Sequence, residues 1–173
     1  MNKPCVFFDR DGIVNQSPGP GYVERLEAFH MLPEFIEAAR IAAERGYETV
    51  IVTNQRGVAL GRMSRQTVDR IHEHLKKILA REGIRLLDIM VCTADDDRDP
   101  NRKPNPGMIM EAAEKHGLDL ARSWMVGDNE KDVEAGRRAG CRTILVDNTT
   151  RPTRADQRVE NMGELVNYLK KSL

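Results

Sequence analysis

Apolar residues along the chain form two kinds of run. Five short runs rich in β-branched and aromatic residues predict buried strands near residues 6–8, 49–55, 86–92, 124–128 and 143–146. Between them the apolar residues recur every three or four positions, which predicts helices beginning near Pro33, Ser64, Met108, Asn129 and Asn161. This alternation predicts an α/β fold with a five-stranded, mainly parallel sheet and helices on both of its faces.

Polar side chains follow four of these strands, at the point where each strand ends. They are Asp9 and Asp11 after the first strand, Thr53 and Asn54 after the second, Lys103 after the third and Asp128 after the fourth. Because the carboxyl ends of parallel strands share one edge of a sheet, we expect these groups to converge there. Asp132 follows one helical turn after Asp128 and is expected to face the same edge.

Two of these carboxylates, Asp9 and Asp11, are separated by a single residue at the end of a buried strand. Like charges this close raise each other's pKa unless a positive charge neutralises them. A hard divalent cation with oxygen ligands, Mg²⁺, or a lysine or arginine side chain meets this need. Taken alone, the same residues also fit an ordinary acidic turn. Above them, the Gly/Pro-rich stretch 17–22 predicts a loop that is either a flap over substrate or a simple connector.

Length and charge exclude several classes of protein. The 173 residues predict one domain over 1–173. Lys plus Arg and Asp plus Glu both number 27, so no net field attracts nucleic acid or a membrane surface. No apolar run approaches the roughly 18 residues of a membrane span, and no signal-peptide pattern opens the chain. Three scattered cysteines favour buried, reduced thiols, so we expect a cytoplasmic protein.

Two features suggest metal sites but fit them poorly. His72 and His74 are two residues apart on a predicted helix and point to different faces, so we interpret them as solvated or interhelix side chains. The acidic run 95–101 lacks the glycine and the final glutamate of an EF-hand loop. A solvated loop is the better interpretation of this run.

Four ordered motifs resemble those of the haloacid dehalogenase (HAD) superfamily of aspartyl phosphatases. They are Asp9-Arg10-Asp11-Gly12, Thr53-Asn54-Gln55, Lys103, and the segment from Gly127 to Asp132. The resemblance spans about residues 5–147 and implies a three-layer, Rossmann-like fold without a large cap domain. Within the superfamily the chain is most similar to the small branch that contains heptose bisphosphate and histidinol-phosphate phosphatases.

The resemblance also implies a role for each motif residue. Asp9 would be the nucleophile and Asp11 the general acid and base. Mg²⁺ would be held by Asp9, the main-chain carbonyl of Asp11, and Asp128. Thr53, Asn54 and Lys103 would bind phosphate. Asp132 and Asn129 would support the metal site, with Asp132 orienting the metal's water ligands or Lys103.

Substrate recognition would then depend on loop residues near these motifs. The candidates are Arg10, Tyr22, Gln55, Arg56 and Arg102. The implied activity is hydrolysis of a small phosphorylated metabolite, with a sugar bisphosphate such as heptose 1,7-bisphosphate first and histidinol phosphate as the alternative. We expect a monomer or small homo-oligomer that binds neither nucleic acid nor membrane.

One departure concerns zinc. Both kinds of relative typically carry a Cys/His zinc loop before the Arg-Lys-Pro motif, whereas here Cys92 is the only residue left that could ligate. We therefore predict no zinc, with a shorter loop ordered by Asp–Arg pairs.

Three other classes fit the sequence less well. A phospho-receiver domain would place its phosphorylated aspartate after the third strand, where Cys92-Thr93 stands. A non-catalytic descendant of the fold is expected to lose Asp9 or Asp11, and both are present. A phosphomutase would need a substantial cap to exclude water.

Overall fold

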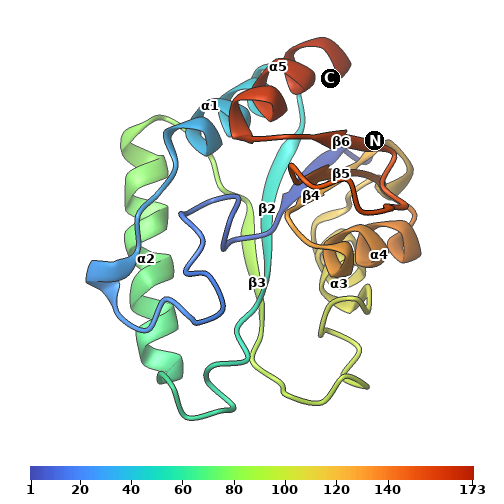
Figure 1. Ribbon diagram of the computed structural model, residues 1–173. Helices are drawn as coiled ribbons and strands as arrows, with labels where there is room; N and C mark the ends of the chain where they lie inside the picture. The colour runs from blue at the N-terminus through green and yellow to red at the C-terminus, as the bar shows by residue number, and fades with distance from the viewer.

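A six-stranded parallel sheet forms the centre of the computed structural model, which describes residues 1–173 (Figure 1). The strands are β1 (Cys5–Phe8), β2 (Glu48–Asn54), β3 (Asp88–Cys92), β4 (Trp124–Gly127), β5 (Arg142–Val146) and β6 (Gln157–Val159). Their spatial order is β3-β2-β1-β4-β5-β6, and every neighbouring pair is parallel. The predicted parallel α/β fold is therefore confirmed.

Five α-helices and two short 3-10 helices connect or follow the strands. They are η1 (Leu26–Ala28), α1 (Pro33–Glu44), α2 (Arg65–Arg81), α3 (Gly107–His116), η2 (Leu120–Arg122), α4 (Glu130–Ala139) and α5 (Met162–Ser172). Side-chain caps fix two of the predicted helix starts: Ser64 Oγ accepts the Thr67 N–H, and Asn161 Oδ1 accepts the Glu164 N–H. None of the helices combines the length and the apolar character needed to cross a membrane.

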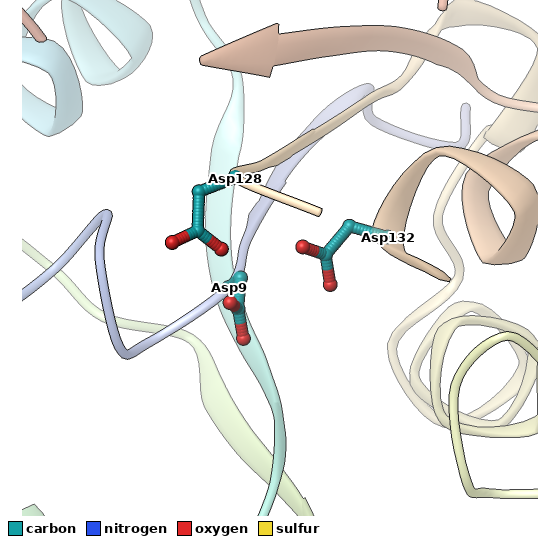
Figure 2. Close-up of side chains that lie close together, drawn as sticks. All are labelled: Asp9, Asp128 and Asp132. Atoms are coloured by element: carbon teal, nitrogen blue, oxygen red, sulfur yellow. The ribbon is translucent and has the colours of Figure 1, made fainter. Parts of the chain in front are cut away.

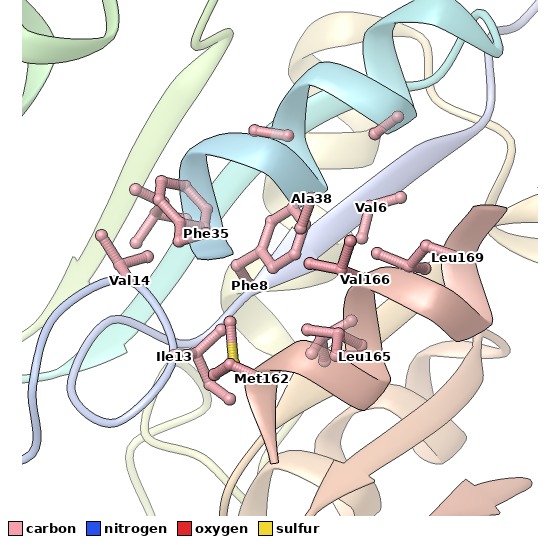
Figure 3. Packing of buried hydrophobic residues seen from close by; sticks show 14 of the residues in the cluster. Val6, Phe8, Ile13, Val14, Phe35, Ala38, Met162, Leu165, Val166 and Leu169 are labelled. Atoms are coloured by element: carbon pink, nitrogen blue, oxygen red, sulfur yellow. The ribbon is translucent and has the colours of Figure 1, made fainter. Parts of the chain in front are cut away.

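Alternate residues of each strand point into two separate hydrophobic cores, one on each face of the sheet. Val6 and Phe8 of β1 pack with α1, α2 and α5, and Figure 3 shows α1 and α5 lying over them. Cys5 and Phe7 pack on the opposite face with residues of α3 and α4. Burial on both faces explains why the strands read as continuous apolar runs.

The sixth strand corrects the predicted count of five. β6 extends the sheet at the β5 edge, where Leu145 pairs with Arg158 and Val146 with Val159. It has only three residues, of which Val159 alone is buried. A strand this short, with Gln157 and Arg158 as its other residues, gives no apolar run that sequence patterning could detect.

The strand order places a reversal of winding at the middle of the sheet. From β1 the chain winds outward through β2 to β3, then crosses by α3 to β4 on the other side of β1. β1 and β4 are therefore neighbours whose following loops diverge in opposite directions. In an open parallel sheet, the crevice at the carboxyl ends of such a pair is where ligands bind.

Candidate active site

The carboxyl ends of β1 and β4 bring Asp9 and Asp128 together. The Asp9 N–H donates to the Val126 carbonyl at 2.9 Å, which continues the pairing of the two strands beyond the end of β1. Gly12 then adopts a φ of 90°, and a Cβ atom there would overlap the Asp128 carboxylate. Glycine at this position thus lets the turn after β1 approach Asp128 closely.

A third carboxylate, Asp132, joins this pair from the first turn of α4 (Figure 2). Asp9, Asp128 and Asp132 each offer one oxygen within 4.8 Å of the others. Asn129 begins α4 as its N-cap: its side chain accepts the Lys131 N–H, and its own N–H donates to Asp132 Oδ2 at 3.1 Å. The predicted position of Asp132 facing the strand ends is confirmed.

Lys103 provides the positive charge closest to these carboxylates. Its buried ammonium donates to Asp9 Oδ1 at 2.8 Å, to Asp132 Oδ1 at 2.6 Å and to the Val52 carbonyl at 2.9 Å. The Asn54 side chain fixes the backbone of Lys103, accepting its N–H and donating to its carbonyl, both at 3.0 Å. Two residues predicted from separate motifs therefore form one structural unit.

The pKa values show that one lysine does not balance the acidic groups. Burial, then the Asp132 carboxylate, raise the pKa of Asp9 well above its usual range, against the pull of Lys103. The same two causes raise the pKa of Asp128 to about 6. Burial disfavours the Lys103 ammonium, but Asp132 and Asp9 outweigh it and raise the pKa of Lys103.

This donor set fits a hard divalent cation. All its ligand atoms are carboxylate oxygens, the type that Mg²⁺ prefers. The raised pKa values of Asp9 and Asp128 show that further positive charge would stabilise their ionised forms. Both oxygens of Asp132 are already hydrogen-bonded, to Lys103 and to the Asn129 N–H, which leaves Asp9 and Asp128 as the freer ligands.

Asp11 also lines this site and is held by three side chains. Arg10 Nε and Asn15 Nδ2 both donate to Asp11 Oδ1 at 3.0 Å, and Gln55 Nε2 donates to Oδ2 at 3.2 Å. Gln55 also donates to Thr53 Oγ1 at 2.8 Å. Asp11 is thus fixed at the edge of the site with its orientation determined by buried neighbours.

A cavity of about 270 Å³ opens over these groups. Its lining comprises Asp9, Asp11, Asn54, Lys103, Asp128, Asn129, Lys131 and Asp132, together with Ser17, Pro18, Gly19, Gly21 and Tyr22 from the loop after β1. The Gly/Pro-rich loop therefore forms one wall of the cavity and is more than a connector. Thr53 is buried and does not line it.

Of the five residues predicted to bind substrate, the structure brings only Tyr22 to the cavity wall. Arg10 and Gln55 are buried behind Asp11, so we expect them to act on Asp11. Arg56 pairs with Asp95, and Arg102 donates to Asp97 Oδ1 at 3.0 Å and to a main-chain carbonyl. Arg102 directly follows the acidic loop, and Arg56, in the loop after β2, pairs with it.

That acidic loop has the predicted character. Residues 95–98 are exposed, and Asp–Arg pairs connect the loop internally and to Arg56. Cys92 lies at its start, 4.0 Å from Asp99 Oδ1, with no histidine or second thiol beside it to complete a zinc ligand set.

The sequence left three residues near the site unpredicted or undecided. Asn15 is fully buried against Asp11, and Lys131 lines the cavity as its second cation. His72 is buried next to Arg10, which excludes the solvated one of its two predicted alternatives, whereas His74 is exposed, as the solvated alternative predicts. The spacing of four residues between Val68 and His72 places both on the buried face of α2 and was the available signal.

Comparisons with known proteins show the family to which the chain belongs. The sequence profile of the HAD-hydrolase-like family matches residues 100–172. A D-glycero-D-manno-heptose-1,7-bisphosphate 7-phosphatase of Thermosynechococcus vestitus is 37% identical over 84% of this chain and 80% of its own length. A D-glycero-beta-D-manno-heptose-1,7-bisphosphate 7-phosphatase of Pseudomonas aeruginosa is 33% identical over 84% of this chain and 82% of its own.

Among solved structures, the D,D-heptose 1,7-bisphosphate phosphatase of B. bronchiseptica superposes with a TM-score of 0.86 at 28% identity. The match covers 98% of this chain and 99% of that one, whose crystal structure contains magnesium and phosphate. The order of the carboxylates and the lysine along the chain and the similarity to these relatives point to the same family. The chain therefore belongs to the HAD superfamily of hydrolases, in the family of small phosphatases that contains these enzymes, and it is a phosphatase.

Proposed function

We propose that this protein is a Mg²⁺-dependent phosphatase that hydrolyses D-glycero-D-manno-heptose 1,7-bisphosphate through a phosphorylated Asp9. One observation carries the proposal. The Asp9 carboxylate lines the cavity with Oδ1 bound to Lys103 and no protein donor on Oδ2, while Asp11 lines the same cavity. A nucleophile and a proton-transfer group thus face one space.

Asp9 supplies the nucleophile in the first half of the reaction. One carboxylate oxygen attacks phosphorus and the ester P–O bond breaks, while Asp11 gives a proton to the departing alcohol oxygen. In the second half Asp11 takes a proton from water, the water oxygen attacks phosphorus, and the bond to Asp9 breaks. Asp11 therefore ends the cycle in the protonation state in which it began.

Three further groups support the charge that develops on the phosphoryl oxygens. Lys103 and Asn54 line the cavity and are predicted phosphate contacts, whereas the Thr53 hydroxyl, predicted with them, is buried and accepts from Gln55 Nε2. Mg²⁺, when bound to Asp9, Asp128 and the main-chain carbonyl of Asp11, would neutralise the carboxylates and the phosphate together. Asp132 holds Lys103 in place by their 2.6 Å ion pair.

The substrate assignment rests on the relatives and on the shape of the site. The two curated relatives compared above are named as heptose bisphosphate 7-phosphatases. A cavity of about 270 Å³ suits a small phosphorylated metabolite. Tyr22 stands in its wall, while Arg56 and Arg102 pair with the acidic loop, do not line the cavity, and would contact substrate only if that loop approaches it.

Phosphate release from a panel of substrates tests the proposal. The panel contains both anomers of the heptose bisphosphate, fructose 1,6-bisphosphate and histidinol phosphate, each with Mg²⁺ and with a chelator, and Asp9→Asn is the control. We expect one heptose anomer to dominate, with release abolished by the chelator and by Asp9→Asn. Preference for histidinol phosphate would overturn the substrate assignment, and phosphate release by Asp9→Asn would overturn the proposed mechanism.

The remaining expectations also belong to this proposal. The enzyme would act in the cytoplasm, as a monomer or small homo-oligomer, without nucleic-acid or membrane partners. The loop that zinc orders in relatives would here be ordered by its Asp–Arg pairs, so stoichiometric zinc is not expected in the purified protein.

A further inference from the structure

Behind Asp11 lies a buried arginine that reaches no substrate. Arg10 is 0% exposed and does not line the cavity. Its Nε donates to Asp11 Oδ1 at 3.0 Å, and its Nη2 lies 2.9 Å from the same oxygen. With the Asn15 amide, Oδ1 accepts two hydrogen bonds, and Nη2 adds an ion-pair contact without a hydrogen bond of its own. Asp11 Oδ2 accepts a single, longer hydrogen bond, from Gln55 Nε2 at 3.2 Å, so a proton carried by Asp11 would reside on Oδ2, the atom that exchanges it with substrate.

The far side of the Arg10 guanidinium contacts His72. Nη1 lies 3.1 Å from His72 Nε2, and His72, on α2, is only 5% exposed. Arginine is always protonated and can only donate, so His72 Nε2 accepts and the ring proton stays on Nδ1. Burial, and then Arg10, lower the pKa of His72 to about 3, so this neutral form persists at the pH values where enzymes work.

The surroundings offer Arg10 few other partners. The Phe29 ring centre lies 6.0 Å from its Cζ, the side chain is fully buried, and Nη2 has no hydrogen-bond acceptor. Without His72, Nη1 would be buried with no acceptor, an arrangement that costs more than the hydrogen bond itself is worth. The guanidinium would then turn away to find an acceptor and would release Asp11 Oδ1.

We propose that His72 is a positioning residue for proton transfer, acting through the chain of contacts His72–Arg10–Asp11. Its neutral ring fixes the guanidinium, which holds Asp11 by Oδ1 and leaves Oδ2 to protonate the leaving alcohol and later to deprotonate water. This inference rests on the proposed phosphatase mechanism and assigns a role to α2, an element that contributes no residue to the cavity lining.

The test compares substrates that do and do not need a proton on the leaving oxygen. A sugar phosphate expels a strongly basic alkoxide, whereas p-nitrophenyl phosphate expels a weakly basic phenolate. We expect His72→Leu to lower kcat/KM for the sugar phosphate by about 10²-fold, within the range that general acid catalysis contributes. For p-nitrophenyl phosphate, kcat/KM should change less than about threefold, because its leaving oxygen needs no proton in that step.

Two variants separate this role from a general loss of structure. His72→Gln keeps an acceptor near the position of Nε2 and should restore most of the lost activity. His74→Leu, on the exposed face of the same helix, should leave both substrates unaffected. If His72→Leu does not fold, Arg10→Lys takes its place. Lysine keeps the positive charge but cannot donate to Asp11 and His72 from two edges of one planar group, as the guanidinium does.

The outcomes are distinguishable. A sugar-selective defect that His72→Gln reverses supports the inference. Equal losses on both substrates, or wild-type rates in His72→Leu, overturn it while leaving the proposed function standing. Absence of phosphate release by the wild-type protein from either substrate would instead overturn the proposed function.

Discussion

Lys103 lies between two carboxylates of the site, 2.8 Å from Asp9 and 2.6 Å from Asp132. Asp128 has no such partner, and its pKa is raised to about 6. At the residue scale the site is therefore built with more negative charge than its own lysine neutralises. This imbalance is what a bound divalent cation and a positive substrate-binding group would correct.

Lys131 is the other cation that lines the cavity, and no ion pair involves it. We expect it to contact the phosphate of a bisphosphate substrate that is not transferred. Lys131→Ala should raise KM for the bisphosphate about fivefold, the loss of about 1 kcal/mol, with little change in kcat. KM for a monophosphate should not change, because that substrate lacks the second phosphate. Lys115 pairs with Asp88, and Lys115→Ala is the matched control. An unchanged KM would show that Lys131 binds no substrate group.

His72 makes stability depend on pH. Its pKa is about 3 in the folded protein and about 6.5 when unfolded, so between these values the unfolded chain binds more protons and stability falls as pH falls. Between pH 7 and pH 5, titration of His72 should lower the free energy of unfolding by about 2 kcal/mol. The His72→Gln variant lacks this contribution, so its stability should depend less on pH. Urea unfolding of both proteins at the two pH values measures it, and equal pH dependence would contradict it.

Several residues that line the cavity were predicted from their place at strand ends, although Thr53, also at a strand end, is buried and does not line it. Asp9, Asn54, Lys103 and Asp128 all face the cavity because parallel strands align their carboxyl ends. Residue type alone did not indicate direction: Arg10 follows Asp9 directly yet points into the protein. The direction in which a side chain points from a turn depends on tertiary contacts, which no local sequence pattern contains. For Arg10 the contact is with His72 of a distant helix.

At the scale of elements, the junction of β4 and α4 determines where Asp132 lies. Asn129 caps α4 and bonds Asp132, while Gly127 ends β4 directly beneath that carboxylate. A Cβ atom at Gly127 would overlap the Asp132 side chain. The glycine thus permits the close approach of helix and strand that delivers Asp132 to Lys103.

Gly127→Ala should therefore displace Asp132 and disturb Lys103. We expect kcat/KM to fall about 10²-fold, as when catalytic groups move by about 1 Å, with the secondary structure retained. Circular dichroism and phosphate release measure the two effects separately. Gly163→Ala in α5, where the added Cβ would meet only Asn161 Oδ1 at 3.2 Å, is the control. Full activity in Gly127→Ala would show that Asp132 need not stay in place.

Helices and strands with strong periodicity or clear caps were predictable from the sequence, whereas the short strand β6 was not. α2 follows its apolar spacing and its Ser64 cap, and β2 follows its β-branched run. β6 is defined by pairing with β5 and by the following α5, since its own three residues have little preference. Tertiary pairing decided its conformation where local propensity did not.

At the scale of the whole molecule, every strand belongs to one sheet and each face of that sheet has one core. We propose that residues 1–173 form a single domain. Unfolding should then be one cooperative transition. Fluorescence of the buried Trp124, the sole tryptophan, reports the β1–β4 centre, and far-ultraviolet circular dichroism reports the helices. Coincident transitions are expected, and separated midpoints would reveal more than one folding unit.

The central claim is that Asp9 carries the phosphoryl group during turnover, and acid quenching tests it most directly. Protein mixed with Mg²⁺ and excess heptose bisphosphate, quenched in mid-turnover and digested, is analysed by mass spectrometry. We predict one phosphoryl group on the peptide that contains Asp9, located at Asp9, and none in Asp9→Asn. A peptide that remains unmodified during rapid turnover, together with phosphate release by Asp9→Asn, would contradict the account.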